Sequence, residues 1–475
     1  MAQLAGSAPS LRSQLLRRKA TVDPADDGGP RLRRSLGTFQ LAMIGVGCTV
    51  GTGIFFSLST AVPKAGPAVV VSFLVACLTA GLAALCYAEL ASNMPVSGST
   101  YSYAYASLGE LVAMGIAACL TLEYGVSAAA SAVGWSGYVN QLFVDLLGVN
   151  LPYWALHPPG VSDGASAGVV NIPAAVLVFL CAVLLVRGVS ESMTVNTIMV
   201  IIKLSVLAFF GAVALTAFNS NNFADFAPMG SAGVVAGSAS IFFTFVGIDA
   251  VSTAGEEVRD PKRTLPRAIL LALGVVLFIY MLVAVAAVGT QPWTAFEGQE
   301  AGLAVILQNV TGQTWPGVLV AAGAVISIFS VVLVAMYGQT RILYAMGRDG
   351  MISKRFAKVS GTTRTPVFNT VVVSLLVALA AAFTPLDALA DVTSIGTIVA
   401  FIVVAISIVV LRRRAGTAPS GFRVPGYPVT PVLTVVVCCY VLSGLGWVTW
   451  AVFGVWIVAT LVYYLRWGRH GSVLN

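Results

Sequence analysis

The feature that most constrains the fold is an interrupted apolar stretch near the start of the chain, residues 45–56. It reads G-V-G-C-T-V-G-T-G-I-F-F, with four glycines within nine residues. Each glycine disfavours a helix interior by about 1 kcal/mol relative to alanine. Unwound backbone at membrane depth survives only where it is buried in protein or lines a watery cavity. We therefore favour a broken helix that offers free N–H groups to an anion; a glycine-rich face for helix packing is the alternative.

The composition identifies an all-α polytopic membrane protein. The 475 residues are 58% apolar and 9% charged, whereas a soluble protein carries about 25% charged residues. Twelve apolar segments have roughly the length of a membrane span. They lie near residues 39–62, 67–91, 108–143, 170–186, 192–217, 231–254, 267–289, 315–346, 367–384, 388–411, 430–447 and 449–465.

The placement of the basic residues predicts the orientation. With a cytoplasmic N-terminus, almost every Lys and Arg falls in an inner loop or tail, Lys64 lies in an outer loop, and Lys203 lies in mid-span. This is the positive-inside pattern, so we expect both termini to be cytoplasmic and the protein to lie in the cell (plasma) membrane. The net charge of +7 therefore reflects topology rather than a nucleic acid partner. Residues 1–35 lack the apolar region of a signal peptide.

The sequence gives no support for a metal site, a cofactor or an enzymatic activity. The seven cysteines lie in apolar segments, and no Cys/His pair has the spacing of metal ligands. H-E-x-x-H, G-x-S-x-G and Walker A motifs are absent from the sequence. We expect neither an enzyme nor an ATP-driven pump.

A second interrupted segment, residues 230–257, follows five spans after the first. It combines a Gly/Ser-rich part, an aromatic cluster, Gly247 and an intramembrane Asp249. Transporters with inverted repeats carry matching broken helices in their two halves, and an offset of five reverses the orientation. We expect a tail (1–35), two repeats (36–217 and 218–414), and two appended spans with a short cytoplasmic C-terminus (415–475).

Several stretches resemble the amino acid–polyamine–organocation (APC) superfamily, and within it the twelve-span bacterial form of the cationic amino acid transporter family. They are I-G-V-G-C-T-V-G-T-G-I-F (44–55), Y-A-E-L-A-S-N-M-P-V-S-G-S-T-Y-S-Y-A-Y (87–105), L-E-Y-G-V-S-A-A-A-S-A-V-G-W-S-G-Y (122–138), V-N-T-I-M-V-I-I-K (195–203), G-I-D-A-V-S-T-A-G-E-E-V-R-D-P-K-R (247–263) and G-Q-T-R-I-L-Y-A-M-G-R-D-G (338–350).

The resemblance implies a LeuT-type 5+5 inverted repeat with helices 1 and 6 broken, plus two further transmembrane helices. It also implies proton-coupled amino acid uptake by alternating access, with arginine, lysine or ornithine as substrate. A broad-specificity or neutral amino acid carrier or exchanger of the same fold is the alternative. The expected partners are the amino acid, a proton and the lipid bilayer, and we expect a monomer, with a small membrane partner as an option.

The first break is the predicted site for the substrate's α-carboxylate. Gly51, Thr52 and Gly53 begin the outer half-helix, where N–H groups lack partners and the helix dipole is positive. The carbonyl of Thr49, on the other side of the break, is available to the α-ammonium.

The second break is expected to complete the ammonium site. By resemblance, the carbonyls of Phe243, Thr244 and Val246 bind the amine, and the Phe243 ring is a gate over the substrate. For the neighbouring Phe242 and Phe245 we favour packing against other helices.

Lys203 is the candidate for proton coupling. A lysine in mid-membrane costs about 2.5–3.5 kcal/mol unless it is neutral or paired, and an amine held away from water can exchange its proton in the working range. Snorkelling to the surface is the alternative. The resemblance implies that Lys203 replaces a sodium ion and faces carbonyls such as those of Gly47 and Val50. Our hypothesis is that protonated Lys203 holds span one against span five. Loss of the proton then allows the helix movement of alternating access.

Three residues are candidates for recognition of the substrate side chain. Intramembrane carboxylates are functional candidates by default, and the resemblance implies that Glu123 receives a cationic substrate group. Asp249 is either part of the site or a cap of the second half-helix. Ala335, if it lines the pocket, leaves room for a long substrate; a packing role is its alternative. A further set is interpreted as inner-face ion pairs that gate or fix topology: Glu89, Glu256, Glu257, Arg341 and Asp349.

Overall fold

A computed structural model describes residues 14–15, 17–18, 36–96, 98–162, 166–187, 192–255, 258–299, 302–360, 365–415 and 421–474. These residues form helices and two isolated β-bridges. Most of the predicted N-terminal tail lies outside the described residues, as do Glu256 and Glu257.

The described chain consists of helices joined by short connections. The α-helices are α2 (Thr38–Thr49), α3 (Thr52–Ala65), α4 (Val69–Asn93), α5 (Ser99–Ser107), α6 (Glu110–Leu120), α7 (Ser127–Leu147), α8 (Tyr153–Leu156), α9 (Ile172–Arg187), α10 (Ser192–Thr216), α11 (Gly230–Phe242), α12 (Ala250–Thr253), α13 (Pro261–Thr290), α14 (Gly302–Thr311), α15 (Trp315–Arg348), α16 (Val367–Phe383), α17 (Leu386–Ala415), α18 (Val429–Leu442), α19 (Trp447–Tyr463) and α20 (Arg469–Gly471). Short 3₁₀ turns are η1 (Gly66–Ala68), η3 (Ser220–Phe223), η4 (Phe243–Phe245), η6 (Trp293–Phe296) and η7 (Lys354–Ala357). Two π-helical turns are η2 (Thr121–Val126) and η8 (Tyr464–Gly468).

Eight helical segments within the described residues are long and apolar enough to cross a membrane. They are Gly53–Asn93, Glu110–Leu147, Asn196–Thr216, Gly230–Thr253, Pro261–Thr290, Trp315–Arg348, Leu386–Arg414 and Trp447–Gly471. Five shorter apolar helices accompany them. Helices occupy all twelve predicted apolar stretches. The chain is thus an all-helical polytopic membrane protein, while the count of twelve spans and the division into two repeats stay predictions.

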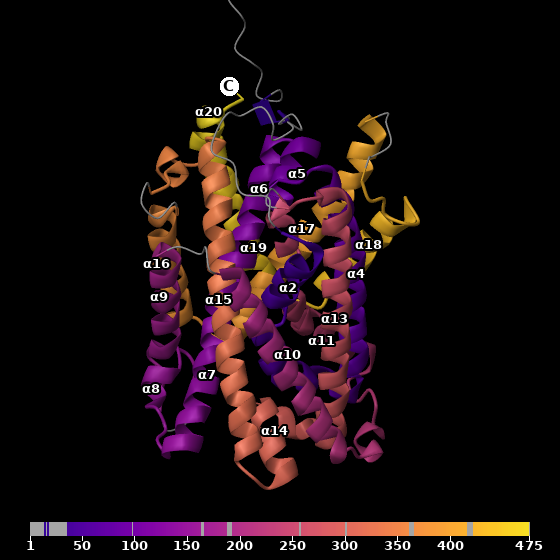
Figure 1. The fold of residues 1–475 in the computed structure, drawn as a ribbon, viewed down its shortest axis with the longest axis vertical. Helices are drawn as coiled ribbons and strands as arrows, with labels where there is room; N and C mark the ends of the chain where they lie inside the picture. Colours follow the sequence, from indigo (N-terminus) through magenta and orange to yellow (C-terminus); the bar gives the residue numbers. More distant parts are fainter. Residues whose placement is uncertain are drawn as a thin grey trace, which may run out of the picture.

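The ends of the bundle separate the predicted inner and outer segments. In Figure 1, α20 and the C-terminus lie at one end, close to α5 and α6, whereas α8 and α14 lie at the opposite end. With a cytoplasmic N-terminus, the loops after the third and seventh predicted spans are expected outside, and these loops contain α8 and α14.

The broken segments lie in the middle of the bundle. Helix α2 packs against α13 and α10, and α11 packs against α3 and α4. Helix α15 lies along α7 and α10. In contrast, only 17% of the most apolar stretch of the segment Trp447–Gly471, which includes α19, is buried. Such low burial is typical of a helix that faces lipid at the edge of the bundle.

Candidate functional site

The first predicted break is present between α2 and α3. Helix α2 ends at Thr49 and α3 begins at Thr52, and between them Val50 (ψ 93°) and Gly51 (φ −146°, ψ −143°) are not helical. A Cβ on Gly51 would lie 2.4 Å from Cγ2 of Val331 in α15, so only glycine fits. The first N–H groups of α3, which include those of Thr52 and Gly53, lack intrahelical partners and lie at the positive end of its dipole.

The other glycines of the stretch serve close packing. A Cβ on Gly45 would lie 2.7 Å from Val251, and one on Gly47 would lie 2.9 Å from Asn196. Both glycines are inside α2, so the packing alternative holds for them. Gly53 brings the two broken segments together, since its Cβ would lie 2.6 Å from the Cα of Thr244.

The second break follows α11. The α-helix ends at Phe242, the 3₁₀ turn η4 follows, and Val246 is extended (ψ 135°). Gly247 has a φ of 96°, which favours glycine, and a Cβ there would lie 2.7 Å from Sγ of Cys48. The two breaks therefore face each other across a narrow space.

Tyr280 of α13 links the two breaks, a contact that the sequence analysis missed. Its hydroxyl lies 2.8 Å from the carbonyl oxygen of Thr49 and 2.8 Å from that of Thr244. Both carbonyls were predicted to bind the substrate amine. A carbonyl has two lone pairs, so each keeps one for a further donor. Tyr280 is one tyrosine in a long apolar helix, and nothing in its local sequence marks the role.

The aromatic cluster of η4 is buried. Phe242 packs on Phe401 with ring centroids 5.7 Å apart, and Phe245 packs on Tyr280 at 5.3 Å, as packing residues should. Phe243 is 4% exposed and lies 5.7 Å from the Phe56 ring. Here the Phe243 ring packs at the junction of α3 and η4, and its gating role stays a prediction.

A small cavity lies beside the breaks. It has a volume of about 10 Å³, room for about one water molecule. The lining residues are Cys48, Glu123, Tyr124, Ser127, Val246, Gly247, Val331 and Ala335. Three predicted site residues thus meet in one place, and Ala335 faces the cavity. An amino acid requires a larger space than this cavity offers.

Glu123 lies in the π-helical turn η2, which the sequence analysis did not anticipate. The π turn interrupts the continuous helical run from α6 to α7, and such turns are frequent at functional sites. Glu123 is 1% exposed, and neither buried carboxyl oxygen has a donor at full hydrogen-bond geometry in the described part of the chain. The side chains of Thr397 and Asp249 are the polar groups that interact with it. A buried carboxyl so weakly bonded can receive a proton or a cation.

Asp249 is the neighbour of Glu123, and its predicted cap role is wrong. It occupies the N-cap position of α12 without a side-chain cap bond. Instead Oδ2 accepts from the Tyr124 hydroxyl at 2.9 Å and from the Ser99 hydroxyl at 3.4 Å, while the buried Oδ1 accepts from none of the described groups. The capping interpretation failed because η2 and α5 supply hydroxyl donors from elsewhere in the chain.

Lys203 of α10 is fully buried, which is incompatible with snorkelling. Its Nζ donates to the carbonyl oxygen of Gly47 at 2.7 Å and to Oγ of Ser330 at 3.5 Å. The lysine therefore ties α10 to α2 and to α15. Gly47 is one of the two carbonyls that the resemblance names; no hydrogen bond to Val50 is present among the described residues.

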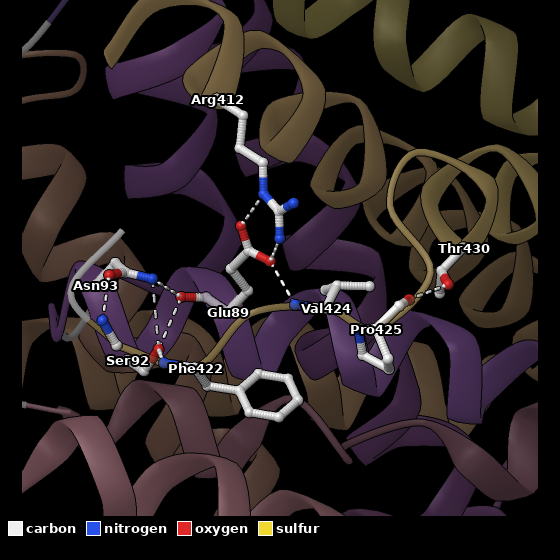
Figure 2. A network of polar contacts seen from close by, with 9 residues as sticks. Glu89, Ser92, Asn93, Arg412, Phe422, Val424, Pro425 and Thr430 are labelled. Carbon is white, nitrogen blue, oxygen red and sulfur yellow. Dashed lines mark hydrogen bonds and ion pairs between the residues drawn. The ribbon is translucent and has the colours of Figure 1, made fainter. Parts of the chain in front are cut away.

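Glu89 forms a buried ion pair at the end of α4, shown in Figure 2. Arg412 of α17 donates to both of its carboxylate oxygens, from Nε at 2.7 Å and from a terminal nitrogen at 2.5 Å. The backbone N–H of Val424 donates to Oε2 at 2.6 Å. The pair connects α4, α17 and the segment before α18, which agrees with a structural role away from the cavity.

Comparisons with known proteins identify the family of the chain. Residues 36–465 match the amino acid permease family. The chain is 40% identical over 467 residues to the branched-chain amino acid permease BcaP of Bacillus subtilis (strain 168), covering 98% of this chain and 100% of that protein. It is 38% identical over 471 residues to the methylthioribose transporter of the same organism, a match that covers 98% of this chain and 100% of that protein. It is 36% identical over 399 residues to human cationic amino acid transporter 4, a match that covers 82% of this chain and 61% of that protein.

Proposed function

The chain belongs to the amino acid permease family of the APC superfamily, and we propose that it imports neutral amino acids, branched-chain ones above all, by proton-coupled alternating access. The family is one of transporters and not of enzymes. This proposal takes the alternative of the sequence analysis in place of a cationic preference. The similarity to BcaP is higher and more complete than the similarity to the human cationic transporter.

The lining of the cavity carries the proposal. Val246, Val331 and Ala335 present aliphatic surface beside the break. If the α-carboxylate binds the N–H groups of Thr52 and Gly53, this aliphatic surface receives the substrate side chain. Burying a methylene group is worth about 0.8 kcal/mol, so a branched aliphatic side chain gains affinity there.

Glu123 supports a second candidate, transport of cationic amino acids. Its buried carboxyl oxygens face the same cavity without a donor at full hydrogen-bond geometry in the described chain. A guanidinium would make strong charge-assisted bonds to such a carboxylate. In the proposal for neutral substrates, a proton shared by Glu123 and Asp249 takes the place of that cation.

Lys203 is the proposed coupling residue. Protonated, its ammonium holds the carbonyl end of Gly47 and thereby fixes α2 against α10 and α15. Loss of the proton weakens a charge-assisted bond to a neutral one, roughly halving its strength. Helix α2 is then free to move and to open the cavity on the opposite side.

Uptake into proteoliposomes tests the proposal. Labelled leucine, arginine and methylthioribose are each offered with and without an inward proton gradient, with valine and lysine as competitors. We expect gradient-driven accumulation of leucine that a protonophore abolishes and valine inhibits. Arginine accumulation that disappears in Glu123→Gln would establish the cationic candidate instead. Accumulation of methylthioribose without either amino acid would refute both.

A further inference from the structure

A second, larger hollow lies away from the transport cavity, between the segment after α15 and the end of α19. It has a volume of about 530 Å³ and is open to the surface. Its lining residues are Gly350, Met351, Ile352, Ser353, Lys354, Tyr463, Trp467, Gly468 and Gly471. We propose that this groove binds an anionic phospholipid at the cytoplasmic face of the membrane.

Polar contacts of neighbouring residues fix the segments that line the groove. The N–H of Val473 donates to the carbonyl oxygen of Asp349 at 3.1 Å. The hydroxyls of Tyr464 and Ser472 each donate to Glu110 of α6 at 2.9 Å. Glu110, Tyr464 and Ser472 are all buried. The C-terminal segment is thus fixed to α6 and to the end of α15, and the groove is preformed.

One wall of the groove consists of exposed aromatic side chains. Trp467 is 61% exposed and Tyr463 is 37% exposed, and their ring centroids lie 5.8 Å apart. Tyr463 is the last residue of the lipid-facing helix α19, and Trp467 lies in η8, which follows it. Exposed Trp and Tyr at a helix end are typical of the membrane–water boundary, where acyl chains and headgroups meet.

The lining of the groove also carries positive charge. Lys354 is one of the lining residues, and Arg355 and Lys358, which come next along the chain, are exposed. None of the three side chains has a hydrogen bond or an ion pair within the described residues. This end of the bundle is also the predicted cytoplasmic end, where anionic lipids are concentrated. The described part of the N-terminal segment is fixed next to these elements, since the N–H of Glu110 donates to the carbonyl oxygen of Arg17 at 2.9 Å and Leu15 packs against the cluster that includes Met351 and Tyr464.

Native mass spectrometry of the full chain measures the lipid directly. The purified protein is exchanged into detergent with equal amounts of phosphatidylglycerol and phosphatidylcholine, and the retained lipid is counted. We expect preferential retention of phosphatidylglycerol, reduced about fivefold by Lys354→Gln, in line with one surface cation near an anionic lipid. Trp467→Ala, which changes no charge, is expected to reduce retention as well.

Lys262→Gln is the matched control, because Lys262 is another exposed lysine, at the start of α13. Its retention of phosphatidylglycerol should equal that of the unchanged protein. The proposal is overturned if the two lipids are retained equally, or if Lys354→Gln and Lys262→Gln behave alike. Displacement of phosphatidylglycerol by millimolar inorganic phosphate would also overturn it, since that outcome assigns the site to a free anion.

Discussion

At the scale of single residues, the candidate site combines groups that water would normally solvate. Lys203 finds two oxygen partners, whereas Glu123 and one oxygen of Asp249 find no donor at full hydrogen-bond geometry among the described residues. Leaving polar atoms unpaired costs free energy, so a permanent structural role would have filled these positions with donors. This supports our proposal that a proton or a substrate group occupies these positions during the transport cycle.

Lys203→Ala is expected to uncouple transport from the proton gradient. The substitution removes the ammonium that joins Gly47 to Ser330, a charge-assisted contact worth about 1.5–3 kcal/mol. Gradient-driven leucine accumulation should fall about tenfold or more, while leucine counterflow persists. Parallel uptake and counterflow assays measure both, with Lys262→Ala as the surface control. Undiminished accumulation in Lys203→Ala would end the coupling hypothesis.

Ala335→Met is expected to narrow the substrate range. The added side chain enters a cavity that is already small, and overfilling a packed site costs about 1–3 kcal/mol. The KM for leucine should rise about tenfold, with a smaller change for alanine, whose side chain stops at one methyl. Ala322→Met, a change at a half-buried position of the same helix, is the control. Equal effects on leucine and alanine would show that Ala335 does not limit side-chain size.

At the scale of elements, each broken helix is defined by glycines that meet specific neighbours. The non-helical residues Val50 and Gly51 separate α2 from α3 because α15 approaches so closely that only glycine fits. In the second break, Gly247 likewise lies so close to a neighbour, Cys48, that a Cβ would clash with it. Helix interruption and close packing are therefore one arrangement, in which the glycines both weaken the helix and admit the neighbour.

Gly51→Ala is expected to abolish transport and to lower thermal stability. Its methyl group would lie 2.4 Å from Val331, a clash that costs about 1–3 kcal/mol. Val331→Ala should restore part of the stability in the double variant, because the two changes share one contact. Gly454→Ala in α19, where a Cβ meets nothing within 4 Å, is the matched control. Melting temperatures in detergent give the relative stabilities of these variants. A double variant no more stable than Gly51→Ala would contradict the proposed clash between residue 51 and Val331.

At the scale of the whole molecule, the sequence predicts the membrane class, the twelve helical stretches and both breaks, since these depend on local composition. It also brings Glu123, Val246 and Ala335 together, because motif resemblance carries long-range information. Tyr280 and the π turn around Glu123 escaped prediction. Both depend on which helices pack side by side, and a single tyrosine or a one-residue change in helical register has no local signature.

The ion pair of Glu89 and Arg412 is expected to stabilise the bundle by joining distant segments of the chain. The pair joins α4 to α17, and Val424 adds the segment before α18, as Figure 2 shows. Removing one partner of a buried pair costs about 3–5 kcal/mol, because the other charge is left unpaired. Arg412 is partly exposed, its side chain at 18%, so we expect the lower end of that range.

Glu89→Gln and Arg412→Gln should each lower the melting temperature by several degrees, whereas Arg413→Gln, an exposed neighbour, should leave it unchanged. The double variant Glu89→Gln/Arg412→Gln should be less destabilised than the sum of the two single changes, since no buried charge remains unpaired. Leucine binding at the distant cavity should survive in all of them. Loss of binding at unchanged melting temperature would instead mean that the pair acts on the transport cycle, and that its structural role is wrong.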